Sequence, residues 1–152
     1  MSEYDDLLLD AYRGEVLGAA LFGAMADAAT DDRQREQLRA LQQVEARTAT
    51  RLRDLVDAAG LDSVADGPTS DGLRMAEATG GGDWSAFLTT LRGALPPFLA
   101  NFERLRELGS PDDPVLEDLV AHERAIDRFA ELELEGRHVE ALDVLDAHLA
   151  NV

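Results

Sequence analysis

The chain has 152 residues, 45% of them hydrophobic and 30% charged, which predicts one globular domain over residues 1–152. It contains no cysteine, which excludes disulfides, thiolate metal ligands, thiol nucleophiles and iron–sulfur clusters. With 31 acidic and 14 basic residues the net charge is −17, so we expect neither nucleic acid nor an anionic membrane surface as a partner.

The first predicted element is an α-helix, which the scarcity of aromatic residues (5%) and the lack of β-branched runs favour throughout the chain. One face of this helix is formed by residues spaced three and four apart: Leu8, Ala11, Glu15, Gly18, Phe22 and Met25. Glu15 is the only acid on this face, which is otherwise apolar or small. The small side chains of the helix predict close packing within a bundle or across a homodimer: Gly14, Gly18, Ala19, Ala20 and Gly23.

The second predicted helix begins after Asp31, a residue suited to capping, and ends at Gly60. Its inward face repeats the same spacing: Leu38, Leu41, Glu45, Thr48, Leu52 and Leu55. Glu45 is the acid on this face. The stretch from Gly60 to Asp83 is too long for a tight turn, so it predicts a crossover along the bundle, with one turn of helix from Leu73 to Ala78.

The third predicted helix, capped by Asp83, has an inward face without an acid: Leu88, Leu91, Leu95, Phe98, Phe102 and Leu105. Pro96 and Pro97 fall within this helix. They predict a kink or a break, because proline lacks the backbone N–H and its ring clashes with the preceding turn. We favour a helix built in two pieces over a kink that shapes a cavity.

The fourth predicted helix starts at Asp113 and Pro114, a capping residue followed by a first-turn proline. Its inward face is formed by Leu116, Leu119, Glu123, Ile126, Ala130 and Glu133 or Leu134. A shorter amphipathic segment follows Gly136 and carries Val139, Leu142, Leu145 and Leu149. Together these elements predict an all-α fold: a four-helix bundle with a long crossover between its second and third helices and a short C-terminal helix.

Three of the four inward faces contain a glutamate, and burying an ionised carboxylate costs several kcal/mol unless it is paired. Glu15 and Glu45 lie equally far from the turn near Thr30, so antiparallel packing places them side by side. The residues of the third helix that face Glu123 include no acid, and Glu103 is the nearest one, about a turn too far along. We therefore predict that the carboxylates of Glu15, Glu45 and Glu123 converge inside the bundle.

His122 is the only histidine within reach of these acids. It directly precedes Glu123 and is therefore rotated about 100° from the inward face, so we expect a satisfied histidine at the boundary of the core, with a metal ligand as the alternative. We expect His138 and His148 at the surface, because their spacing does not bring two imidazoles together on one helix face.

All 14 basic residues are arginine. Self-repulsion at this net charge destabilises a compact state unless ions screen it, and the screening length is about 3 Å at 1 M salt, so we expect a halophilic source. A GC-rich genome is the alternative explanation for arginine in place of lysine. Residues 1–10 carry acids where a secretory signal carries bases, and no apolar run reaches about 18 residues, so we expect a soluble, cytoplasmic protein.

From about Tyr4 to Glu135 the chain resembles the ferritin-like superfamily, the rubrerythrin and ferritin type of four-helix bundle. Members place a Glu on the first and third helices and a Glu-x-x-His on the second and fourth, and these residues hold two irons. By resemblance Glu15 matches the first Glu, and Glu45 and Glu123 match the acids of the two Glu-x-x-His motifs.

The chain departs from the superfamily pattern at three ligand positions. Thr48 and Ile126 stand where the two histidines are expected, and the third-helix Glu is missing unless Glu103 serves. The resemblance therefore implies the fold and the crossover, together with an incomplete di-iron site.

We favour a non-catalytic ferritin-like bundle whose metal site has decayed and which has no resident cofactor. The alternative is an iron- or manganese-binding protein in which Glu15, Glu45 and Glu123 hold the metal, with Glu103, His122 or water completing the shell. The resemblance implies oxidase or peroxide chemistry for that alternative.

A third interpretation is a pocket for an unidentified small molecule beside Pro96 and Pro97. Phe98 and Phe102 would line this pocket, and the same acids would face it.

Overall fold

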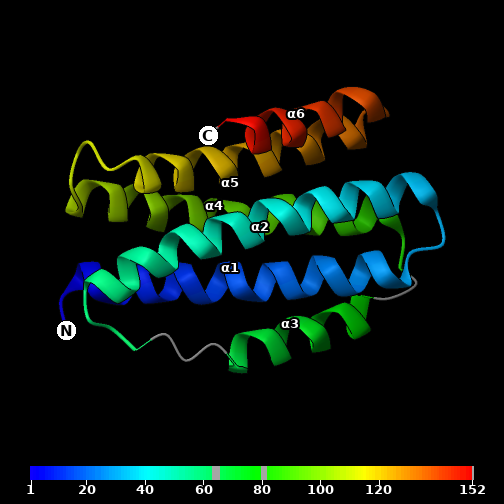
Figure 1. Ribbon diagram of the computed structural model, residues 1–152. Coiled ribbons are helices and arrows are strands. Elements are labelled where there is room, and N and C mark those ends of the chain that lie inside the picture. Colours follow the sequence, from blue (N-terminus) through cyan, green and yellow to red (C-terminus); the bar gives the residue numbers. More distant parts are fainter. Residues whose placement is uncertain (63–65, 80–81, 152) are drawn as a thin grey trace.

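The computed structural model describes residues 1–62, 66–79 and 82–151. These residues form helices and no strand, as the all-α prediction requires (Figure 1). The helices are α1 (Glu3–Ala28), α2 (Asp32–Ala58), α3 (Asp66–Thr79), α4 (Trp84–Leu108), α5 (Pro114–Leu134) and α6 (His138–Ala150). None of the described helices is both long and apolar enough to cross a membrane.

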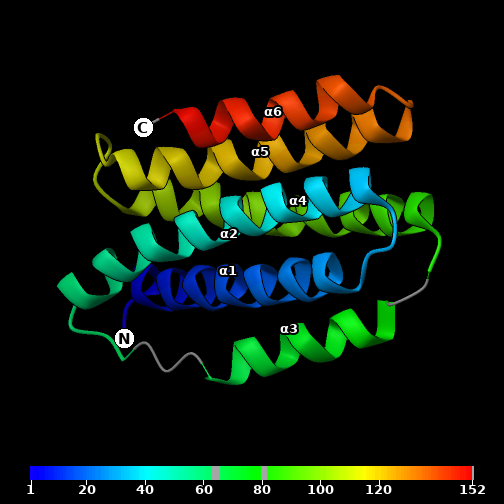
Figure 2. The same ribbon diagram turned by 45° about the vertical axis from the view of Figure 1, so that its right-hand side comes forward.

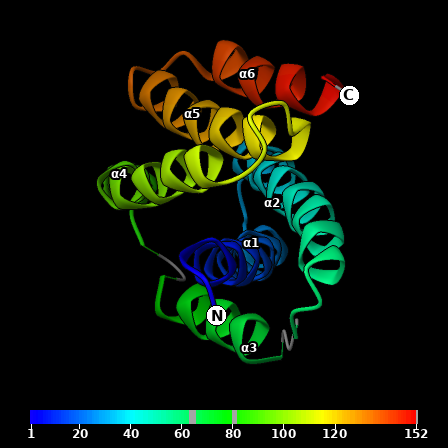
Figure 3. The ribbon, with the colours of Figure 1, turned by 90° about the vertical axis from the view of Figure 1, so that its left-hand side faces the viewer.

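Helices α1, α2, α5 and α4 are neighbours in cyclic order, as the end-on view shows (Figure 3). α1 packs on α2, α2 on α5, α5 on α4, and α4 on α1. The pairs α1–α2 and α4–α5 are antiparallel, and α3 runs back along α1, so α2 and α4 point the same way (Figure 1). α3 covers the outer side of α1, and α6 covers α5 and α2 (Figure 2).

The helix starts follow from local capping chemistry. Ser2 forms a capping box with Asp5, in which the Ser2 hydroxyl accepts from Asp5 N at 3.1 Å and the Asp5 carboxylate accepts from Ser2 N at 3.2 Å. Asp31, Asp83 and Asp113 cap α2, α4 and α5, each accepting a hydrogen bond from a first-turn backbone N–H. The three predicted caps are confirmed.

The crossover is more ordered than the single turn of helix that we predict for it. α3 is a 14-residue helix that packs along α1. At Gly72 an added Cβ would overlap the carbonyl oxygen of Leu17, so the two backbones approach closely where no side chain intervenes. Ala76 is buried in this contact. Docking on α1 therefore stabilises a segment whose own sequence favours turns.

The predicted break at Pro96 and Pro97 is wrong, because α4 continues as one helix from Trp84 to Leu108. Each proline deprives a carbonyl four residues earlier of its helical donor, and these carbonyls belong to Arg92 and Gly93. Both prolines and Gly93 are exposed, so water can hydrate the freed carbonyls and the helix need not end.

The apolar core has two parts, and polar residues separate them. One part contains Phe22, Leu41 and Phe129, and the other contains Leu8 and Leu52. Along α1, α2 and α5, five of the buried polar residues occupy the interval between these parts: Glu15, Glu45, Thr48, His122 and Glu123. The candidate site therefore lies about midway along the helices, with apolar packing on both sides.

Candidate functional site

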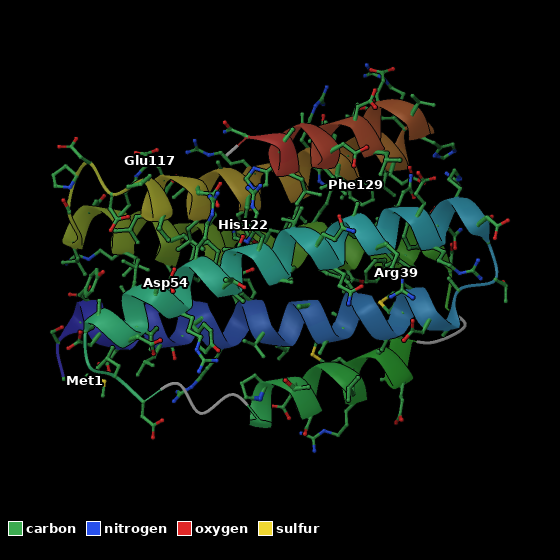
Figure 4. The ribbon with its side chains drawn as sticks, in the orientation of Figure 1. Met1, Arg39, Asp54, Glu117, His122 and Phe129 are labelled. Carbon is green, nitrogen blue, oxygen red and sulfur yellow. The ribbon has the colours of Figure 1, made fainter. Side chains whose placement is uncertain are left out.

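A buried imidazole and three carboxylates meet at this interval. α1 supplies Glu15, α2 supplies Glu45, and α5 supplies both His122 and Glu123. The three glutamates are between 3% and 7% exposed, and His122 is fully buried. Figure 4 labels His122 near the middle of α5, between that helix and α2.

The imidazole of His122 faces the carboxylates through Nε2. This atom lies 3.0 Å from Glu15 Oε1, 3.4 Å from Glu123 Oε2 and 3.9 Å from Glu45 Oε2. The other ring nitrogen, Nδ1, makes a short hydrogen bond with the carbonyl of Leu119, to which it can only donate. The backbone therefore fixes the ring orientation and directs Nε2 at the acids.

Two buried atoms of the site have no partner in hydrogen-bond geometry: Glu15 Oε2 and His122 Nε2. A buried polar atom without a hydrogen bond costs about 1–3 kcal/mol, and more when the group is charged. Ligand atoms of Glu15, His122 and Glu123 lie within 4.8 Å of one another, close enough to hold one cation. A cation at this point would satisfy the unpaired oxygen and nitrogen together.

Burial and neighbouring charges shift the pKa values of His122 and Glu123. Burial disfavours the imidazolium of His122, but the negative charges of Glu15 and Glu123 outweigh it and raise the pKa of His122 to about 9. Burial raises the pKa of Glu123 to about 7, against the lowering effect of His122. Each acid thus favours a cationic neighbour, which is either the imidazolium or a bound cation.

Gly18 makes room for the carboxylate of Glu45. A Cβ at Gly18 would lie 2.9 Å from Glu45 Cδ, a distance that forces the carboxylate to move. We interpret the small residues of this helix as a packing surface, but at Gly18 the space is occupied by an acid of the site. The glycine therefore bears on the position of Glu45 as well as on helix packing.

The two positions at which the ferritin-like resemblance implies histidines offer no metal ligand to the site. Thr48 donates its hydroxyl to the carbonyl of Val44 at 2.9 Å, and Ile126 belongs to the apolar core. His122 brings the only imidazole near the acids among the described residues. It occupies a different position on α5 from that of the expected histidine.

The prediction that His122 lies at the core boundary is wrong, because His122 is fully buried. Helix α6 packs on α5 and covers the side of α5 next to its inward face. The ring of His148 on α6 lies 6.4 Å from the ring of His122, centroid to centroid. On the other side, the Phe102 ring of α4 lies 5.8 Å away. An added layer of helix thus turns a boundary position into an interior one.

His148 is also buried, contrary to the surface position that we predict. Its Nε2 lies 3.1 Å from Arg47 Nη2 and 3.7 Å from Asp118 Oδ1. Burial lowers the pKa of His148 against the opposing effect of Asp118, and Arg47 lowers it further. Arg47 and Asp118 therefore anchor α6 to α2 and α5, and Arg51, 3.0 Å from Asp118, adds a second link between α2 and α5.

Glu103 does not reach the site. Its carboxylate pairs with Arg124 at 3.0 Å, and its side chain is 40% exposed. α4 instead presents Phe102 to the cluster, so no acid from α4 joins the described cluster.

A cavity of about 460 Å³ opens beside the acids, between α1 and α4. Glu15, Glu45 and Glu123 contribute to its wall. Phe98 and Phe102 line it as well, as the small-molecule interpretation requires. Pro96 lies outside this cavity and lines a neighbouring groove between α4 and α5, which shares Leu95 and Glu123 with the cavity.

No family model, no curated protein and no solved structure matches this chain. The chemistry of the site therefore follows from its donor set, which is one imidazole nitrogen and up to three almost fully buried carboxylates. Such a set can bind a divalent cation, or it can balance its own charges as a buried ion-pair cluster.

Proposed function

We propose that this chain is a ferritin-like four-helix bundle that binds one divalent transition-metal ion, iron or manganese, through Glu15, His122 and Glu123. The observation that carries the proposal is the orientation of His122. Its Nδ1 is committed to a backbone carbonyl while Nε2 faces the acids, an arrangement common among metal-ligating histidines.

The donor set fits iron or manganese. Carboxylate oxygens suit Mn²⁺, and imidazole nitrogen suits iron, so a mixed set of this kind accepts either metal. Glu15 Oε2 has no hydrogen-bond partner among the described residues, and His122 Nε2 faces the carboxylates that would share the ion. Glu45, which lies farthest from Nε2, is the natural fourth ligand.

Helix arrangement supports the ferritin-like assignment. Two antiparallel pairs, α1–α2 and α4–α5, are joined by a long crossover that contains α3 (Figure 1). This is the up-down order with one crossover that ferritin-like bundles use. The four helices that contact one another in cyclic order are those that the sequence predicts as the bundle.

One metal rather than two is expected from the ligands. A di-iron site needs inward acids from four helices and two histidines, whereas α4 presents Phe102 and the cluster has one imidazole. A bound ion of this kind supplies a Lewis-acid or one-electron redox centre. The chain's own residues orient the imidazole through Leu119 and pack apolar side chains on both sides of the site.

Titration calorimetry of chelator-treated protein with Mn²⁺ tests the proposal. We expect a stoichiometry near one and a loss of affinity of at least about tenfold in Glu123→Gln and in His122→Gln. No measurable binding by the wild-type chain, with the fold intact by circular dichroism, would rule the metal site out.

Glu133→Gln is the matched control, because Glu133 is a second buried acid on the same helix. Its carboxylate accepts hydrogen bonds from Arg33, Gln37 and Trp84, so it has no vacant lone pair directed at the cluster. This variant should lose stability and keep its Mn²⁺ affinity. Equal losses of affinity in Glu123→Gln and Glu133→Gln would mean that the substitutions act on the fold.

The same distances favour a second candidate, a non-catalytic bundle without metal. His122 lies near enough to Glu15, Glu123 and Glu45 to balance them as a buried ion-pair cluster. In that case Glu123→Leu should leave stability unchanged or improved, because replacing buried charge by apolar volume is often neutral or favourable. Metal analysis of protein purified without chelator separates the two candidates.

A further inference from the structure

The cavity beside the acids is large enough for a ligand of its own. Its volume of about 460 Å³ falls within the roughly 300–1,000 Å³ of small-molecule sites. It lies between α1 and α4, and α3 contributes Met75 to its edge. Met75 and Phe98 are both about half exposed, so the cavity is open to solvent on this side.

The two ends of the cavity differ in chemistry. Most of its wall is apolar, and it includes Leu17, Leu21, Phe98 and Phe102. Its deepest polar residues are acids only, among them Glu15 and Glu45, which are almost fully buried. A ligand that fills the cavity therefore needs an apolar body and one group that donates hydrogen bonds.

An independent observation marks the polar end as incomplete. Glu15 is 3% exposed, yet its Oε2 has no hydrogen-bond partner among the described residues. Buried acceptors are normally satisfied, so this oxygen calls for a donor. The net charge of the chain, −17, attracts cations and repels anions, which disfavours fatty acids and other carboxylates as occupants.

We propose that this cavity binds a small organic amine, with its ammonium group on Glu15 and Glu45 and its apolar body against Phe98 and Phe102. An ammonium supplies three hydrogen-bond donors and a positive charge, which suit paired carboxylates. The binding site does not depend on the metal, because the cavity and its acids are present in the chain alone.

The two ligands oppose each other. An ammonium and a divalent metal ion both draw on Glu15, so each lowers the affinity for the other by the same factor. The amine site is therefore measured in chelator-treated protein, and the metal site is measured without amine.

The probes are three molecules of similar shape: 2-phenylethylamine, the neutral 2-phenylethanol and the anionic 3-phenylpropanoate. Calorimetry of the metal-free protein should show binding of the amine with a stoichiometry near one. The alcohol should bind at least about tenfold more weakly, and the carboxylate should not bind measurably. Amine binding no tighter than that of the alcohol would overturn the proposal.

Gly14 provides a variant that blocks the cavity. It lines the cavity, and an added Cβ would meet no atom within 4 Å, so Gly14→Leu places its first side-chain carbon without a clash. Gly93→Leu is the matched control, because Gly93 has equally open surroundings but lines the neighbouring groove between α4 and α5 and not the cavity. Gly14→Leu should weaken amine binding at least about tenfold, and Gly93→Leu should leave it within about twofold.

Glu45→Gln decides the outcome if Gly14→Leu fails to fold. It should weaken the amine and leave the alcohol unaffected, because only the amine is held by charge. An unchanged ratio of the two affinities would overturn the proposal. Amine binding without any Mn²⁺ binding would refute the proposed function alone, whereas the reverse result would refute the amine site alone.

Discussion

Glu133 is the clearest case of a buried acid whose role is structural, and its replacement has a calculable effect. It lies on α5 and is 4% exposed. Its carboxylate accepts from Arg33 at 2.6 Å, from Gln37 at 2.7 Å and from Trp84 at 3.0 Å, and it lies 2.8 Å from His138 Nδ1. These partners come from α2, α4 and α6, so one carboxylate ties four helices together.

The expected loss of stability in Glu133→Gln is about 3 kcal/mol. Breaking a buried ion pair costs about 3–5 kcal/mol, and the lower end applies because solvent reaches Arg33, whose side chain is 38% exposed. The glutamine oxygen still accepts, but its NH₂ group faces donors that it cannot satisfy. For a chain of this length the loss corresponds to a fall in Tm of about 6–12 °C.

The loss of stability in Glu133→Gln should depend on pH. Burial would raise the pKa of Glu133, but the donors from His138, Trp84, Gln37 and Arg33 outweigh it and hold the pKa below its ordinary value of 4.5. A carboxyl whose pKa is lowered on folding stabilises the fold fully above its unfolded pKa. The stability gap between wild type and Glu133→Gln should therefore shrink as the pH falls below 4.5.

Urea denaturation of the two proteins from pH 7 to pH 3 measures this gap. Glu135→Gln, an exposed acid at the end of the same helix, is the control and should change stability by less than about 0.5 kcal/mol. A Glu133→Gln protein within that same margin at pH 7 would refute the argument that the carboxylate joins the helices.

Two further changes test close approaches of backbone and side chain. Gly72→Ala should destabilise the protein by about 2 kcal/mol, because the new Cβ overlaps the Leu17 carbonyl. It should also speed proteolysis of the crossover. Unchanged protease resistance would contradict the close packing of α3 on α1. Gly18→Ala should weaken Mn²⁺ binding by displacing Glu45. Gly14→Ala should leave Mn²⁺ binding intact and stabilise the helix by up to about 1 kcal/mol. Equal Mn²⁺ affinities in the two variants would mean that Gly18 does not affect the site.

The helix starts could be predicted because their chemistry is local. Asp31, Asp83 and Asp113 each cap through a backbone N–H two or three residues away, and such an interaction needs no knowledge of the rest of the fold. α3 could not be predicted in the same way. Gly67, Pro68 and Gly72 disfavour a helix locally, and the contact with α1 that offsets them is a tertiary one.

The helix break predicted at Pro96 and Pro97 is wrong for a related reason. The rule against proline inside a helix counts a lost hydrogen bond and a steric clash, both of which matter most where the backbone is buried. Pro96 and Pro97 lie on an exposed side of α4, where water can replace the lost donors. Whether a helix face is exposed depends on its neighbours, which the spacing of apolar residues indicates only in part.

The position of the acids depends on hairpin geometry, and the position of His122 does not. Glu15 and Glu45 lie equally far from the α1–α2 turn, and both contribute to the cluster around His122. His122 is buried because α6 covers its side of α5. The spacing of residues within α5 does not indicate that contact. The amphipathic character of the C-terminal segment was the one available sign that a further helix covers the bundle.

Glu123 and Glu133 show why a buried acid must be judged by its partners. Both lie on α5 and both are about 5% exposed or less; the sequence places Glu123 on the inward face and leaves Glu133 and Leu134 as alternatives for the last inward position. Glu133 is surrounded by donors, so its charge is already compensated and burial strengthens those bonds. Glu123 is surrounded by further acids and one imidazole, and burial raises its pKa, together with the charge of Glu15 and against the lowering effect of His122. A cation, whether metal ion or amine, stabilises the second environment and would gain nothing in the first.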